Sequence, residues 1–144
     1  MRLELSNRTH LAKLAMEQLA SDGSGQPVKG GDLAAVIGTT RHYLPQVMRP
    51  LVAPGWVASE PGPSGGYRLT DSGRRTTLLQ LIEAVEGPIV NGRCVLRGAA
   101  CPPSEPCALH ETWSRARSAM VAELGAVRVV PIPARNQNPK KGRP

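Results

Sequence analysis

The chain has 144 residues, which is enough for one domain with a modest hydrophobic core and a short appended arm. Its 18 Lys and Arg residues outnumber 11 Asp and Glu and give a net charge of +7, but four of the basic residues and no acidic one follow Pro131, which leaves 14 minus 11, or +3, on residues 1–130. Phenylalanine is absent and only two Trp and two Tyr are present, which argues against a stacking platform for single-stranded nucleic acid. We find no apolar run of membrane-spanning length and no signal peptide, so we expect a cytoplasmic protein without a membrane partner.

The first third of the chain predicts three helices. Ser6 can cap a helix that runs to about Ser21 and is followed by a Gly-rich turn over 22–31. A short second helix begins near Asp32 and ends at Gly38, because glycine readily adopts the left-handed conformation that follows many helices. A third helix then follows. The residues expected on the buried faces are Leu11, Leu14, Ala15, Leu19, Leu33, Val36, Ile37, Tyr43, Leu44, Val47, Met48 and Leu51.

The start of the third helix is complicated by a proline. Thr39 or Thr40 can cap this helix, and with Thr40 as the cap Pro45 lies in the second turn. There it would remove a backbone hydrogen bond and clash with the preceding turn, at a cost of about 3 kcal/mol. We therefore expect the helix to start late or to kink, and Pro50 adds a second interruption. Two helices around a Gly-containing turn favour a helix-turn-helix, with a simple helical hairpin as the alternative.

Two short strands follow the helices. They are predicted over 56–59 and 67–70 and are joined through 60–66. A hairpin placed after a helix-turn-helix is a wing. The predicted fold class is therefore mainly α with a small β wing: a winged helix-turn-helix domain plus one long dimerisation helix.

The rest of the chain predicts two helices around a loop. The first carries Leu78, Leu79, Ile82 and Val85 and ends at Gly87, and the second runs from about Ala108 to Leu124, where Gly125 can end it. The second has an apolar stripe of Leu109, Trp113, Ala116, Met120 and Leu124, which we interpret as the seam of a homodimer. We divide the chain into a winged domain (1–87), a cysteine loop with the dimerisation helix (88–128), and a basic, disordered tail (129–144).

All three cysteines and one histidine fall in a short stretch, as Cys94-x6-Cys101-x5-Cys107-x2-His110. Thiolates with one imidazole suit zinc or an iron-sulfur cluster. From the spacing alone, zinc and an iron-sulfur cluster are equally good interpretations, and a site without metal stays open. Gaps of six and five residues are wide for a zinc knuckle and slightly favour a cluster. Nothing suggests secretion, which argues against disulfides. We find no phosphate loop, nucleophile elbow or HExxH motif, so we expect no enzyme.

Several strings occur together in one order. They are Met1-Arg2-Leu3, Tyr43-Leu44 with Gln46, Gly55-Trp56-Val57, GGYRL at 65–69, IEAVEGP at 82–88, and the three cysteines. In this order the chain resembles, over about residues 1–128, the iron-sulfur winged-helix transcriptional regulators typified by IscR, NsrR and RirA. The resemblance implies a homodimeric repressor or activator that binds a palindromic promoter site on double-stranded DNA. It also implies a cluster that reports iron supply, redox state or nitric oxide.

The same resemblance implies a ligand set. Cys94, Cys101 and Cys107 are cluster thiolates in this interpretation, and His110 is the fourth ligand, as in the IscR type. Three thiolates and one histidine favour a 2Fe-2S cluster, with 4Fe-4S as the alternative, particularly if a non-protein ligand completes the site. Other members take a carboxylate from the first helix, but Arg8 stands there in this chain and cannot be deprotonated to ligate. His10 is a rival donor.

The DNA-contacting residues depart from the family pattern in two places. Pro45 stands where a polar base-reading residue is usual, and 60–64 of the wing lacks the arginine that often enters a groove. Our candidates for base or phosphate contact are Lys13, Thr40, Arg41, His42, Tyr43, Gln46, Arg49 and Arg68, and for each basic residue a solvated surface is the alternative. Two other classes of protein stay open: a zinc-stabilised DNA-binding module without sensing, and a small iron-sulfur electron-transfer protein.

Overall fold

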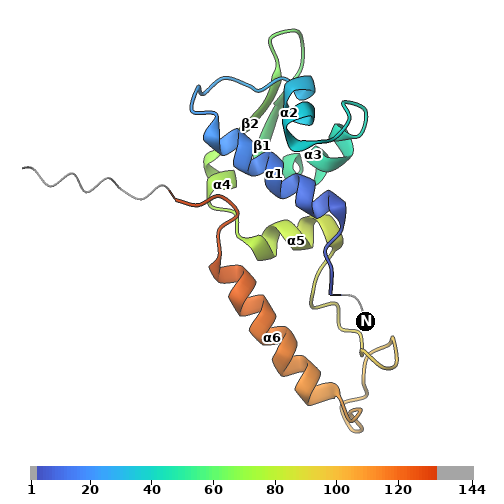
Figure 1. Ribbon diagram of the computed structural model, residues 1–144. Helices are drawn as coiled ribbons and strands as arrows, with labels where there is room; N and C mark the ends of the chain where they lie inside the picture. The colour runs from blue at the N-terminus through green and yellow to red at the C-terminus, as the bar shows by residue number, and fades with distance from the viewer. Residues whose placement is uncertain (1–2, 133–144) are drawn as a thin grey trace, which may run out of the picture.

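The computed structural model describes residues 3–132, and its helices and strands confirm a mainly α fold with a two-stranded wing (Figure 1). The last twelve residues of the expected tail, 133–144, lie outside the described residues. None of the described helices is long and apolar enough to cross a membrane. In chain order the elements are α1 (Asn7–Ser21), α2 (Gly30–Ile37), α3 (Leu44–Val52), β1 (Val57–Glu60), β2 (Gly66–Leu69), α4 (Asp71–Arg74), α5 (Leu78–Glu86) and α6 (His110–Ala126).

One hydrophobic core lies between α1, α2, α3 and α5. The predicted cap of α1 is confirmed, because the Ser6 hydroxyl accepts a hydrogen bond from the Thr9 amide at 3.3 Å. The apolar face of α1 then packs on the other three helices. Each fully buried Leu or Met side chain stabilises the fold by about 1.5–3 kcal/mol relative to its exposed state. The largest such side chains are Met16, Leu33, Leu44, Met48, Leu51 and Leu81.

The helix-turn-helix forms where the sequence indicated, with changes in detail. α2 begins at Gly30, two residues before the expected start, and ends as predicted at Gly38, which has φ +77°. The prediction that Val36 faces inward is wrong: its side chain is 62% exposed, because Leu33 and Ile37 already define the buried face.

The proline in α3 is accommodated by a late start. The Thr40 hydroxyl accepts the Tyr43 amide at 3.1 Å, so a separate turn precedes the helix, which begins at Leu44. Pro45 is therefore in the first turn, where a helix needs no amide donor, and the late start that we expected is confirmed. Pro50 lies inside the helix, in the stretch that ends at Val52.

The wing is an antiparallel hairpin shifted by one residue from each predicted strand. Val57 pairs with Leu69 and Glu60 with Gly66. Thr70, which we expected in the second strand, instead caps the short helix α4, because its hydroxyl accepts the Gly73 amide at 3.1 Å. The hairpin is also tied to the segment before α2 through an isolated bridge between Val28 and Tyr67.

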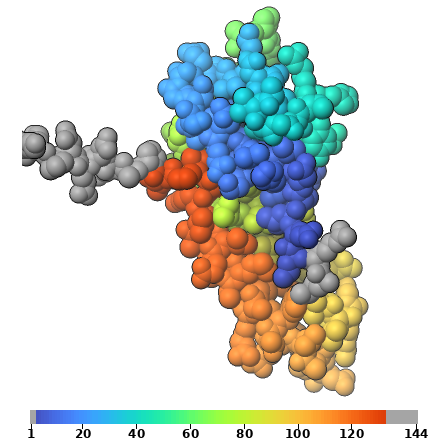
Figure 2. Space-filling view, viewed as in Figure 1, coloured from blue at the N-terminus to red at the C-terminus, as the bar shows by residue number. Residues whose placement is uncertain are grey.

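α6 extends away from the hydrophobic core, and the segment that follows α6 returns to that core. α6 runs to Ala126, so the expectation that Gly125 ends it is wrong; Gly125 has no left-handed backbone conformation and lies beside Leu79 of α5. The chain then pairs with the start of α5, since the Val129 amide donates to the Thr76 carbonyl at 3.0 Å. Val129 and Val130, which we assigned to the tail, are buried. α6 and the loop before it form the narrow lower part of the molecule (Figure 2).

The end of α5 is fastened to the start of α1 by polar contacts. A carboxylate oxygen of Glu86 accepts the Ser6 amide at 2.8 Å and also the Thr9 hydroxyl. Arg8 donates from Nη2 to the Val85 carbonyl at 2.6 Å. Hydrogen bonds from Ser6, then from Thr9, hold the pKa of Glu86 below its ordinary value, with a smaller contribution from the charge of Arg8.

Glu86→Gln is expected to lower the stability of the protein at neutral pH by less than about 1 kcal/mol, because the carboxylate is exposed. A carboxylate with a lowered folded pKa stabilises the fold above its unfolded pKa and ceases to do so as the pH falls through the folded pKa. Urea unfolding of wild type and variant should therefore differ at pH 7 and converge well below pH 4.5, the ordinary value. The matched control is Glu123→Gln on the exposed surface of α6, and equal curves for all three proteins at pH 7 would contradict the prediction.

Candidate metal centre and DNA-binding surface

The cysteine loop, residues 88–109, connects α5 to α6 and lies beside α6 at the end of the molecule away from the wing (Figure 1). It has little regular structure and is held by local hydrogen bonds. The Cys94 amide donates to the Ala99 carbonyl at 2.8 Å, and the Gly98 amide donates to the Cys94 carbonyl at 3.0 Å. Arg93 closes the same turn by donating from Nε to the Gly98 carbonyl at 2.8 Å.

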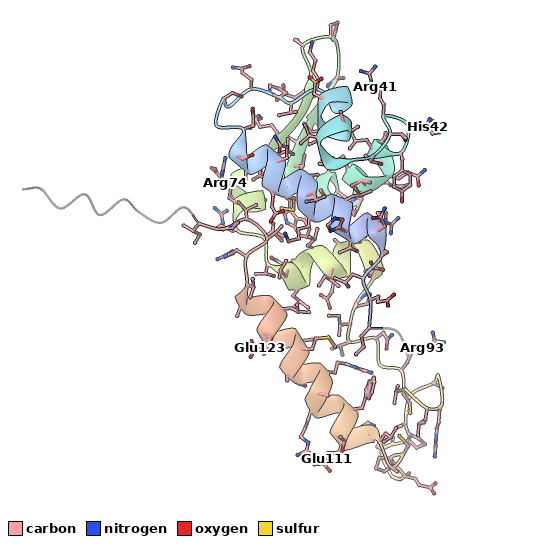
Figure 3. The ribbon with its side chains drawn as sticks, in the orientation of Figure 1. Arg41, His42, Arg74, Arg93, Glu111 and Glu123 are labelled. Atoms are coloured by element: carbon pink, nitrogen blue, oxygen red, sulfur yellow. The ribbon has the colours of Figure 1, made fainter. Side chains whose placement is uncertain are left out.

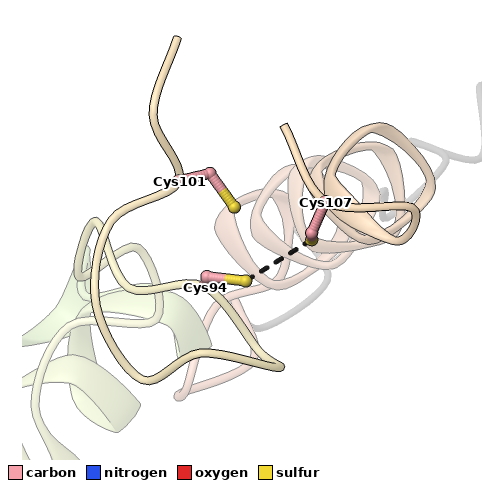
Figure 4. Close-up of side chains that lie close together, drawn as sticks. All are labelled: Cys94, Cys101 and Cys107. Carbon is pink, nitrogen blue, oxygen red and sulfur yellow. Dashed lines mark hydrogen bonds between the residues drawn. The ribbon is translucent and has the colours of Figure 1, made fainter. Parts of the chain in front are cut away.

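The loop brings the three cysteines together. Their Sγ atoms all lie within 4.8 Å of one another, and their side chains converge from separate parts of the loop, with Cys107 shortly before α6 (Figure 4). Sγ of Cys94 and Sγ of Cys107 are 3.5 Å apart, and none of the three is in a disulfide. The thiols are half-buried and line a cavity of about 200 Å³. Three convergent thiols suit a metal or iron-sulfur site.

Hydrogen bonds within the loop shift the pKa values of Cys94 and Cys101 in opposite directions. Hydrogen bonding by the Arg97 backbone, then by the Cys101 thiol, lowers the pKa of Cys94 from 9.0 to about 7. The Cys107 backbone lowers the pKa of Cys101, but hydrogen bonding with Cys94 and burial outweigh it, so that the pKa of Cys101 is raised. Cys94 therefore ionises before Cys101, and a thiol must be ionised to bind a metal.

Neither candidate histidine ligand, His110 or His10, belongs to the group of three convergent thiols. His110 begins α6, donates its amide to the Cys107 carbonyl at 3.0 Å and lines the same cavity, but its imidazole is exposed and is not among the ligand atoms that lie within 4.8 Å of one another. His10 is exposed on α1 and does not line this cavity. Arg8 is held by the Val85 carbonyl.

The residues expected to contact DNA gather mainly at the other end of the molecule. Arg41 and His42 are exposed in the turn before α3, and both reach outward near α2 and α3 (Figure 3). Gln46 and Arg49 are exposed on α3 itself. Tyr43 is half-buried and packs against the core, so less of its side chain is free to reach a base.

Three other candidates already have partners within the described structure. Arg68, on β2, forms an ion pair with Glu60 at 3.3 Å, and both side chains stay largely exposed. Lys13 forms an ion pair with Glu17 at 2.5 Å on α1, away from the turn before α3 in sequence. Thr40 is exposed, and its hydroxyl caps the turn before α3.

The sequence analysis did not single out Lys29, which precedes α2. Lys29 and Arg41 line one surface hollow together with residues of the wing. The guanidinium of Arg41 lies over Gly31, where an added Cβ would be 2.1 Å from Nη2. A basic residue just before a helix start was the available signal, because helix N-termini favour phosphate.

A helix-turn-helix followed by a wing, with exposed basic and polar residues on and before its second helix, defines a winged-helix DNA-binding protein. The chain belongs to the Rrf2 family, described as iron-dependent transcriptional regulators, whose sequence profile matches residues 5–132. It is therefore a DNA-binding transcriptional regulator, and the expectation that it is not an enzyme is confirmed by this family.

Individual proteins that are similar to this chain are also regulators. A protein of Mycobacterium tuberculosis assigned as an HTH-type transcriptional regulator is 30% identical over 122 residues, covering 85% of this chain and 76% of the relative. IscR of Cronobacter sakazakii is 30% identical over 111 residues, covering 77% of this chain and 68% of IscR. The structure of CymR, the global cysteine regulator of B. subtilis, matches with a TM-score of 0.70 and 27% identity, covering 89% of this chain and 94% of CymR.

Proposed function

We propose that this protein is a homodimeric regulator that holds an iron-sulfur cluster and changes its affinity for a palindromic promoter site with the state of that cluster. The observation that carries the proposal is the convergence of Sγ of Cys94, Cys101 and Cys107 within 4.8 Å, in a loop that contains all the cysteine of the chain. The similarity to IscR supports it.

The ligand set that we propose is Cys94, Cys101 and Cys107 with His110 as the fourth donor. His110 supports this set because it lines the thiol cavity and its side chain is exposed, although it is not within the group of ligand atoms that lie within 4.8 Å of one another. This set favours a 2Fe-2S cluster, with 4Fe-4S as the alternative. When bound, such a cluster supplies a centre that can change its electron count and is sensitive to oxidants and nitric oxide. The thiols bind it, and the loop decides how exposed it is.

Homodimer formation would cover α6. None of the 17 residues of α6 is buried within the single chain, although the helix carries apolar side chains. Leu109, just before the helix, and Met120 are 41% and 43% exposed. Packing two such helices together would bury these residues, as in other helix-paired dimers. Two reading helices in such a dimer would have to meet half-sites about 34–36 Å apart.

DNA contact is proposed for the exposed side of the helix-turn-helix and wing. We propose that Gln46 and Arg49, which are exposed on α3, contact base edges or phosphates, together with Arg41, His42 and the edge of Tyr43. Arg68 is the wing candidate, and its exposed pair with Glu60 costs little to open. Thr40 and Lys13 are proposed to contact the DNA backbone.

A chain of contacts connects the two ends of the molecule. The Ile89 amide, at the start of the cysteine loop, donates to a Glu83 carboxylate oxygen of α5 at 3.1 Å. The end of α5 is in turn fastened to α1 through Glu86 and Arg8, and α1 packs on α3. We propose that loop order biases the position of α3 through α5 and α1. A tenfold change in DNA affinity requires a preference of about 1.4 kcal/mol for one state.

The test is an anaerobic absorption and Mössbauer spectrum of the purified protein, followed by promoter binding with and without the cluster. We expect a 2Fe-2S spectrum and DNA binding that weakens with salt and differs between the two forms. A colourless protein with stoichiometric zinc would identify a zinc-stabilised module instead. Equal DNA affinity of both forms would contradict sensing.

His110→Ala is expected to weaken or retune the cluster, because it removes the imidazole that lines the thiol cavity. Loss of one ligand should raise the rate of cluster loss by about tenfold or more and shift the visible spectrum. The matched control is His10→Ala, on the exposed surface of α1, which should leave both unchanged. If His10→Ala changes the spectrum and His110→Ala does not, the fourth ligand is wrongly assigned.

A further inference from the structure

One face of α6 closes the thiol cavity. His110, Trp113 and Arg117 all line it, and their spacing of three and four residues places them on one side of the helix. Trp113 and Arg117 are half-buried, whereas the three residues between them are exposed. Arg117 is therefore a cationic residue that lines the same cavity as the three cysteines.

The charges around this cavity are unbalanced. No Asp or Glu is among its described lining residues, and the acidic groups that line it are the three thiols. Arg117 has no carboxylate oxygen within 4.0 Å in residues 3–132, where the ion pairs are those of Lys13 and Arg68. Arg117 therefore brings to the cavity a positive charge that no carboxylate in residues 3–132 pairs with.

Arg93, the other arginine that lines the cavity, stabilises the turn of the loop. Its Nε is committed to the Gly98 carbonyl at 2.8 Å, and its side chain is exposed on the loop (Figure 3). Arg93 thus holds the turn between Cys94 and Cys101. Arg117, on α6, is a second cation at the cavity, and its side chain is half-buried where that of Arg93 is exposed.

We propose that Arg117 is the electrostatic partner of the metal-thiolate centre and raises its reduction potential; this inference rests on the proposed function. The positive charge of Arg117 would offset the negative charge of a metal-thiolate centre, and so would help the cavity retain it. A bound centre would gain one negative charge on accepting an electron from an external reductant without a proton. Arg117 would stabilise that more negative state and so raise the reduction potential.

The experiment compares Arg117→Gln and Arg117→Lys with Arg115→Gln, a control two residues away whose side chain is exposed and does not line the cavity. Each protein is loaded anaerobically, its iron and sulfide are measured, and it is titrated with dithionite against redox mediators. Melting of the metal-free proteins checks that the fold is unchanged.

Arg117→Gln should reduce the ratio of reduced to oxidised centre by about threefold at the wild-type midpoint potential, a shift of about −30 mV for one electron. Arg117→Lys should keep most of the wild-type potential, and Arg115→Gln all of it. If Arg117→Gln holds too little iron to titrate, retention by the Lys variant supports the role of charge, and loss in both variants overturns it.

An unchanged midpoint potential in fully loaded Arg117→Gln would also overturn the inference, and would leave the proposed function intact. A wild-type protein that takes up no iron-sulfur cluster would instead overturn the proposed function. The two failures are thus distinguishable.

Discussion

Cys107→Ala is expected to abolish the visible absorption of the loaded protein and to change its promoter affinity by about tenfold, equivalent to about 1.4 kcal/mol. Cys107 occupies a special position among the three thiols. Its Sγ is 3.5 Å from that of Cys94, and its carbonyl accepts the amide of His110, the first residue of α6. A metal bond at Cys107 would therefore fasten the cysteine loop to the helix that we propose as the dimer seam.

Iron content and the absorption spectrum should be measured together with fluorescence anisotropy on promoter DNA at two salt concentrations. The matched control is Ser104→Ala, in the same loop and exposed, which should behave as wild type in both measurements. Because Cys107 is not in the turn or helix that we propose to contact DNA, a change in DNA affinity would not come from a lost contact there. Unchanged colour, or unchanged affinity in a colourless variant, would contradict coupling between the cluster and DNA binding.

The helix-turn-helix could be predicted from sequence because its signals are local. Ser6 and Gly38 mark helix ends through short-range backbone chemistry, and the core residues follow the helical period. The late start of α3 follows from a local property of Pro45. Val36 shows the limit of this reasoning, because an apolar residue at the edge of a helical stripe can face solvent.

Non-local pairing was not predictable in the same way. Val129 and Val130 precede a basic, Pro-rich segment and read as part of a tail, yet they enter the core because their backbone pairs with the start of α5, about fifty residues earlier. No helical or strand period marks so short a segment. The helix α4 was missed for a related reason, since Thr70 could serve either the strand or the cap.

The site was predictable to the extent that spacing decides it. Three cysteines within fourteen residues of loop could converge, and they do. The side chain of His110 does not join them, because a residue at a helix start can point to either side of the loop. Arg117 was not identified at all, since only the packing of α6 on the loop shows that this arginine, and not Arg115, lines the thiol cavity.

Gly66→Ala is expected to destabilise the protein by about 3 kcal/mol and to lower its melting temperature by about 10 °C. Gly66 has φ +153°, and a Cβ added there would lie 2.2 Å from the Val28 carbonyl oxygen. That oxygen accepts the Tyr67 amide at 2.8 Å, and the Val28 amide donates back to the Tyr67 carbonyl at 2.8 Å. Since the clash is with backbone, the segment must move and both hydrogen bonds weaken, at about 1 kcal/mol each. Backbone strain at the positive φ adds about 1 kcal/mol.

The control is Gly23→Ala, in the turn after α1, where an added Cβ meets nothing within 4 Å and which should change stability by less than about 0.5 kcal/mol. Thermal melting should be paired with promoter binding measured well below the melting transition. Because Tyr67 belongs to β2, loss of the Val28 bridge frees the wing, and we expect weaker DNA binding from folded Gly66→Ala. A melting temperature equal to that of Gly23→Ala would show that the wing does not depend on this close approach of two backbones.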